Sequence, residues 1–124
     1  MNPLELIKYA IKAQGNSQSQ YSNFPVGCAL LSHDDKIIYG CNIESAVYPS
    51  TLCAERVAIY SALSTGIVKF KSIAIVSNNS AKPCGSCRQI IYEYLGDIPI
   101  YISDSKGLDY KEHSIGELLP YPFG

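Results

Sequence analysis

Three cysteines and one glutamate have the types and spacing of a catalytic metal centre. Cys84 and Cys87 form a Cys-x-x-Cys pair, and two cysteines at this spacing can place both sulfurs on one tetrahedral zinc ion. Cys53, which belongs to a separate upstream segment, can supply a third sulfur. Three protein ligands leave the fourth coordination position open for water, as in catalytic zinc sites. The sequence therefore predicts a zinc centre that can act on a substrate.

Glu55 follows Cys53 by two residues and can serve this centre as a general acid and base. Three thiolates would give the zinc site a net negative charge and damp its Lewis acidity, unless nearby cations withdraw charge from sulfur. Arg56 and Arg88 directly follow the two cysteine segments. We expect at least one of these arginines to donate a hydrogen bond to a ligand sulfur. The alternative is that both form surface ion pairs.

The composition is that of one soluble domain over residues 1–124. Hydrophobic residues make up 47% of the chain and charged residues 17%, as is typical of globular domains of this size. The formal net charge of −1 provides no basic field, so nucleic acid is not expected as a partner. No apolar run is long enough to span a membrane, and the N-terminal residues do not have the pattern of a signal peptide. We expect a cytoplasmic protein with no membrane contact.

Apolar periodicity and turn residues predict an alternation of helices and strands. The expected helices cover 3–14, 53 to about 66, 84–95 and 114–119, and the expected strands cover 26–31, 36–42, 72–77, 98–102 and 110–112. This order describes a three-layer α/β domain in which the third and fourth strands run parallel across a helical crossover. Both cysteine segments begin helices, where unpaired N–H groups favour the thiolate form.

Four motifs resemble those of the small zinc-dependent cytidine deaminases, which are usually homotetrameric. They are Tyr21-Ser22-Asn23-Phe24, Gly40-Cys41-Asn42-Ile43-Glu44, Cys53-Ala54-Glu55-Arg56 and Pro83-Cys84-Gly85-Ser86-Cys87-Arg88-Gln89. The resemblance covers nearly the whole chain. It implies a three-layer α/β/α cytidine-deaminase-like domain with a mixed central sheet of about five strands.

The resemblance also implies a role for each matching residue. Cys53, Cys84 and Cys87 would bind one Zn²⁺ per subunit and Glu55 would shuttle protons. For the substrate, Asn42 and Glu44 would hold the ribose hydroxyls. Phe24 would pack on the nucleoside, and the Ala54 N–H would contact the base carbonyl. Phe123 would reach the active site of a neighbouring subunit. The carboxylate of Glu44 would disfavour a 5′-phosphate, so free nucleosides are the expected substrates.

The implied reaction is hydrolytic deamination of cytidine and 2′-deoxycytidine to uridine and 2′-deoxyuridine, with release of ammonia, in pyrimidine salvage. A related deaminase that acts on a blasticidin-type antibiotic or a free base would have similar cysteine segments. The residues Phe24, Asn42 and Glu44 favour the nucleoside, because a ribose accounts for them and a bare base does not.

A structural zinc or redox module is the alternative from a different class. A structural zinc site normally has four protein ligands, and the fourth would have to be Cys28, Cys41, His33 or His113. The two cysteines lie in apolar strand-like runs and are expected to be core thiols. The two histidines are expected to be exposed residues without a role in the site.

Overall fold

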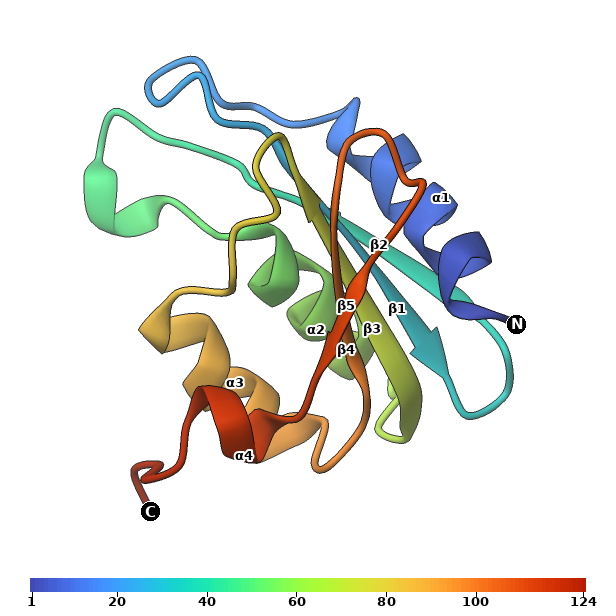
Figure 1. Ribbon diagram of the computed structural model, residues 1–124. Helices are drawn as coiled ribbons and strands as arrows, with labels where there is room; N and C mark the ends of the chain where they lie inside the picture. The colour runs from blue at the N-terminus through green and yellow to red at the C-terminus, as the bar shows by residue number, and fades with distance from the viewer.

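The computed structural model describes all residues from 1 to 124, and Figure 1 shows the arrangement of their helices and strands. In chain order the elements are α1 (Pro3–Gln14), β1 (Val26–Ser32), β2 (Ile37–Cys41), the 3-10 helix η1 (Tyr48–Ser50), α2 (Ala54–Ser64), β3 (Phe70–Ser77), α3 (Gly85–Tyr94), β4 (Ile100–Asp104), β5 (Lys111–His113) and α4 (Ile115–Leu118). All the predicted helices and strands are present, and most of their ends lie within two residues of the predicted positions. No helix is both long enough and apolar enough to cross a membrane.

The five strands form one mixed sheet in the order β2-β1-β3-β4-β5. The pair β3 and β4 is parallel, as predicted from the helical crossover between them, and the other neighbouring pairs are antiparallel. Strand β3 is buried along six consecutive positions, as expected for a central strand covered on both faces. The predicted α/β architecture is therefore confirmed.

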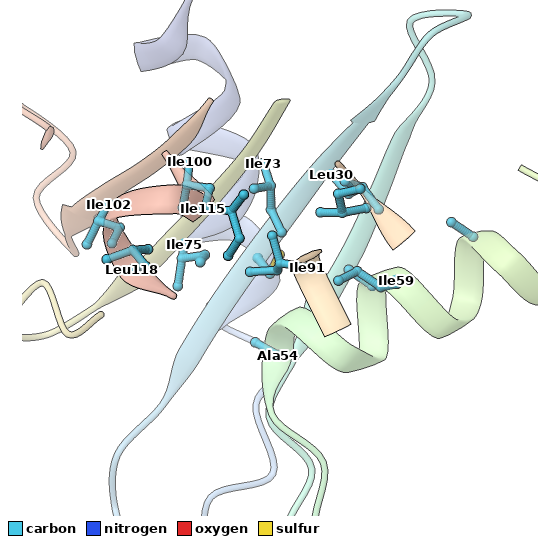
Figure 2. Packing of buried hydrophobic residues seen from close by; sticks show 14 residues of the cluster. Leu30, Ala54, Ile59, Ile73, Ile75, Ile91, Ile100, Ile102, Ile115 and Leu118 are labelled. Atoms are coloured by element: carbon cyan, nitrogen blue, oxygen red, sulfur yellow. The ribbon is translucent and has the colours of Figure 1, made fainter. Parts of the chain in front are cut away.

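Helices cover both faces of the sheet and give three layers (Figure 1). On one face α1 packs alone, and its residues Leu6 and Ile7 form a buried cluster with Ala29 and Val76 of the sheet. On the other face α2, α3 and α4 share a larger cluster. Figure 2 shows that Ile59 of α2 and Ile91 of α3 point into this cluster. The face covered by α2 and α3 is also where both cysteine segments begin their helices.

Gly40 in β2 sets the distance between the sheet and the first turn of α2. A Cβ at this position would lie 2.2 Å from the carbonyl oxygen of Ala54 and 2.7 Å from the backbone nitrogen of Ala58. Any side chain there would push the start of α2 away from the sheet, because these contacts are with backbone atoms. The glycine therefore places Cys53, the N-cap of α2, close to the end of β2.

Two local expectations differ from the structure. The expected elements leave residues 43–52 without a helix or strand, but this segment contains the short helix η1 and a bridge between Ile43 and Leu52. His113 was expected to be exposed, but it is the last residue of β5 and its side chain is only 16% exposed. Its Nδ1 lies 3.3 Å from the Glu117 carboxylate, one turn into α4. His113 is buried by the pairing of β5 with β4, which is a tertiary contact. The short polar run around His113 does not indicate this pairing.

Candidate active site

Two helix N-termini bring the three predicted cysteines together. Cys53 is the N-cap of α2, Cys84 is the N-cap of α3, and Cys87 lies in the first turn of α3. Their sulfur atoms all lie within 4.8 Å of one another. The sulfurs of Cys53 and Cys84 are 3.8 Å apart, close to the ~3.8 Å between ligands of a tetrahedral zinc ion with Zn–S bonds of ~2.3 Å. The cluster therefore fits one zinc ion.

Hydrogen-bond donors around the sulfurs favour thiolates, the form that binds zinc. The backbone N–H of Cys87 points to Cys84 Sγ at 3.5 Å, and the Arg56 guanidinium donates to Cys53 Sγ at 3.4 Å. The pKa of Cys53 is lowered to about 5, first by a hydrogen bond with the Cys87 thiol and then by Arg56. The same contact raises the pKa of Cys87. Cys53 is thus prepared to bind a metal as a thiolate, whereas Cys87 holds the shared proton and would lose it on metal binding.

No fourth metal-binding side chain joins this cluster. Cys28 is buried in the core, where burial raises the pKa of its thiol, and Cys41 is half-buried. His33 is exposed and His113 is bonded to Glu117. The site therefore offers three candidate protein ligands, the number typical of catalytic zinc, and not the four that a structural site normally has.

Arg56 and Arg88 have different hydrogen-bond partners. Arg56 contacts a ligand sulfur, as expected of at least one of the pair, and its buried Nε has no hydrogen-bond partner. Arg88 does not contact sulfur. It donates at 2.7 Å to the carbonyl of Pro83 and at 2.7 Å to the carbonyl of Leu118, so it ties the segment before Cys84 to the end of α4.

Glu55 lies at the second position of α2, and only 3% of its surface is exposed. The pKa of its carboxyl is raised to about 7, mainly by burial and to a smaller extent by the nearby Cys53. A carboxyl group with this pKa can accept and release a proton near neutral pH, as a general acid and base must. Glu55 is also one of the residues that line a cavity of about 250 Å³.

That cavity joins the metal cluster to the predicted substrate residues. It is lined by Phe24, Asn42, Glu44, Ala54, Glu55, Cys53 and Cys84, with Ser22, Val26, Thr51, Leu52, Ile75, Ala81 and Lys82. The N–H of Ala54 is at the first position of α2, where no intrahelical acceptor exists. A larger cavity of about 410 Å³ beside β4 and β5 has no cysteine in its wall, so of these two cavities only the smaller reaches the cysteine cluster.

Asn42 is more constrained than its expected role suggested. Its side chain is 8% exposed, and its Oδ1 accepts hydrogen bonds from the Val26 N–H and the Ser17 hydroxyl. Its Nδ2 donates to the Phe24 carbonyl at 2.9 Å and lies 3.5 Å from Glu44 Oε2. Only this last contact is long enough for another group to replace it.

Glu44 is also held from several sides. Its Oε1 accepts from the backbone N–H groups of Tyr21 at 3.0 Å and Ser22 at 2.9 Å, and its Oε2 accepts from the Ser22 hydroxyl. These bonds, with that from the Ser22 side chain as the largest cause, lower the pKa of the Glu44 carboxyl. Sequence reasoning missed Ser22 as a site residue, although it is part of the Tyr-Ser-x-Phe motif that was noted.

Phe123 is the one expected substrate residue that lies outside the cavity. Its side chain is 86% exposed, and the side-chain amide of Gln89 bonds its backbone at both the N–H and the carbonyl. Within a single chain, Phe123 therefore does not contribute to the site.

The fold and the site define a zinc-dependent deaminase, and comparisons with known proteins give the same class. Residues 2–101 match the family model described as the cytidine and deoxycytidylate deaminase zinc-binding region. A cytidine deaminase from Sporosarcina psychrophila is 43% identical over 99% of this chain and 92% of its own. The crystal structure of a cytidine deaminase from Burkholderia pseudomallei superposes with a TM-score of 0.92 at 39% identity, covering 99% of this chain and 100% of the other.

A more distant relative is a blasticidin-S deaminase from Bacillus cereus, 32% identical over 79% of this chain and 76% of its own. The chain belongs to the cytidine and deoxycytidylate deaminase family, and it is a hydrolytic deaminase.

Proposed function

We propose that this protein converts cytidine and 2′-deoxycytidine to uridine and 2′-deoxyuridine with release of ammonia. One observation carries the proposal: a single cavity has the three-cysteine cluster and buried Glu55 in one part of its wall, and Asn42 and Glu44 in another. The cytosine ring would lie at the cysteines and the ribose would lie at Asn42 and Glu44.

Zinc, when bound by Cys53, Cys84 and Cys87, would supply the Lewis acidity that brings the pKa of water close to neutrality. Glu55 would take the proton of the attacking water on its carboxylate. It would then deliver protons to N3 of the base and to the departing amine. Burial suits Glu55 to these steps because it raises the carboxyl pKa to about 7. The free N–H of Ala54 would hold the base carbonyl.

The hydrogen bonds that Asn42 and Glu44 already form limit how many more they can form with the ribose. A carboxylate has about four lone-pair positions, and Tyr21 and Ser22 occupy three of those on Glu44. The remaining position faces Asn42 Nδ2 across 3.5 Å. A single hydroxyl placed beside this pair could accept from Asn42 and donate to Glu44 at ordinary hydrogen-bond distances. Recognition of one hydroxyl fits both the ribose and the deoxyribose nucleoside.

The antibiotic-deaminating alternative has the relative from Bacillus cereus in its favour. Against a free base, the Asn42 and Glu44 side chains argue for the nucleoside, because together they suit a sugar hydroxyl that a bare base lacks. The antibiotic is separated from the nucleosides by experiment.

The remaining features of the proposal concern the assembly and the cell. We propose that the chain forms one domain, that four copies assemble, and that Phe123 closes the site of a neighbour. Exposure of its ring and the two bonds that fix its backbone support this role. We also propose that the enzyme acts in the cytoplasm in pyrimidine salvage, with no nucleic acid or membrane partner.

A steady-state comparison of cytidine, 2′-deoxycytidine, cytosine and blasticidin S tests the substrate. The zinc-loaded protein should release ammonia from both nucleosides with similar kcat/KM, and it should turn over the free base and the antibiotic much more slowly. Preference for blasticidin S or cytosine would overturn the assignment. Bound zinc with no ammonia release from any of the four would favour a structural zinc site.

A further inference from the structure

We propose that Ser22 is a positioning residue for the sugar, because its hydroxyl joins the Glu44 carboxylate to the backbone of Phe24. This inference rests on the proposed function, in which Glu44 and Phe24 bind a nucleoside. Neither the family match nor the similar proteins assign a role to this serine. Ser22 also lines the cavity itself.

The Ser22 hydroxyl has two partners from different parts of the chain. It donates to Glu44 Oε2, and it accepts from the backbone N–H of Phe24 at 3.1 Å. The Ser22 N–H adds a bond to Glu44 Oε1 at 2.9 Å. One serine therefore contacts both carboxylate oxygens and the residue expected to pack on the nucleoside.

The local bond to Phe24 alone would be of little interest, because serine often bonds the backbone two residues ahead in turns. The bond to Glu44 differs from this pattern because it joins two segments that lie 22 residues apart in sequence. Without the hydroxyl, Oε2 would lose its strongest fixed donor. The carboxylate could then turn away from the gap beside Asn42, where the sugar hydroxyl is expected.

The turn that contains Ser22 lies outside the regular elements. Tyr21 and Ser22 are exposed and lie outside any helix or strand. Asn23 has a φ of 54°, in the left-handed region that asparagine tolerates better than most residues. Its N–H donates to the Ser19 carbonyl at 2.8 Å. Bonds of Gln18 and Phe24 with residues after β2 hold the two ends of this segment. Between them, three hydrogen bonds to Glu44 hold the turn itself, and Ser22 provides two of the three.

The test is a comparison of Ser22→Ala, Ser22→Thr and Ser19→Ala with the wild type in the zinc-loaded enzyme. Ser19 is a matched control, because it lies in the same segment and its hydroxyl forms no hydrogen bond. Two ligands are used: cytidine, and 2′,3′-dideoxycytidine, which keeps the 5′-hydroxyl but lacks the 2′- and 3′-hydroxyls that Glu44 is expected to accept from. The dideoxynucleoside is measured as a substrate or as a competitive inhibitor.

Loss of a hydrogen bond that orients a charged group should raise the KM for cytidine roughly tenfold in Ser22→Ala. The kcat and the zinc content should stay near the wild-type values, because the cysteines and Glu55 are untouched. The affinity for 2′,3′-dideoxycytidine should change several-fold less. Ser22→Thr should restore most of the affinity for cytidine, and Ser19→Ala should behave like the wild type.

A Ser22→Ala variant with an unchanged KM for cytidine would overturn the inference, and so would equal losses for both ligands, which would indicate general loosening of the turn. Failure of the proposed function would look different. In that case the wild-type protein itself would not deaminate cytidine.

Discussion

The side-chain amide of Gln89 forms two hydrogen bonds with the backbone of Phe123. Gln89 Nε2 donates to the Phe123 carbonyl at 2.9 Å, and the Phe123 N–H donates to Gln89 Oε1 at 3.0 Å. Glu93 holds the same amide from the next turn of α3 at 2.9 Å. The backbone of Phe123 is thereby fixed on the helix that carries Cys84 and Cys87, while its ring points to solvent.

The first prediction is that Phe123→Ala weakens the active site of a neighbouring subunit. Loss of a buried aromatic contact, worth about 1.5–3 kcal/mol, should lower kcat/KM for cytidine roughly ten- to a hundredfold. Co-expression of Phe123→Ala with the inactive Glu55→Gln chain tests whether the contact crosses subunits. Mixed assemblies contain sites with Glu55 from one chain and Phe123 from the other, so they should be more active than either variant alone. Purely additive activities would refute a contact between subunits.

The second prediction separates the two arginines. Arg56→Gln removes the donor to Cys53 Sγ and should lower zinc affinity or kcat by roughly ten- to a hundredfold, as is typical of changes around metal ligands. Arg88→Gln leaves the sulfurs untouched but frees the carbonyls of Pro83 and Leu118, so it should chiefly lower the melting temperature. Zinc titration, kcat and thermal unfolding of both variants measure the difference. Equal effects on zinc affinity would contradict these roles.

The third prediction concerns the contact between β2 and α2. Gly40→Ala would place a Cβ 2.2 Å from the Ala54 carbonyl oxygen, and overpacking of this kind typically costs about 1–3 kcal/mol. The melting temperature and the zinc affinity should both fall, because the displaced helix carries Cys53. Gly116→Ala in α4 is the control. A Cβ there would meet only the Ser114 hydroxyl, at 3.8 Å. Equal melting temperatures for the two variants would show that the helix can move at no cost.

Local sequence patterns predicted the fold and the metal cluster well. Cys53 and Cys84 begin helices, and helix starts can be read from the residues that follow them. The parallel pairing of β3 with β4 follows from the length of the crossover through α3. In these cases the determining interactions are close in sequence or follow from general rules of topology.

The hydrogen-bond partners around the site could not be predicted in this way. Residue types showed that Arg56 and Arg88 were candidates to contact sulfur, but the path of α4 decides that Arg88 bonds Leu118 instead. The link from Ser22 to Glu44 depends on how an irregular turn meets the end of β2. Such pairings are tertiary, so no periodicity in the sequence indicates them.

The most direct test of the central claim is to measure zinc content and cytidine turnover in parallel for the wild type, Glu55→Gln and Cys87→Ala. Glutamine keeps the size of the side chain but cannot carry the proton. Glu55→Gln should therefore retain about one zinc per chain and lose turnover by at least about a hundredfold. Cys87→Ala should lose both zinc and activity. Near-normal deamination of cytidine by Glu55→Gln would contradict the account.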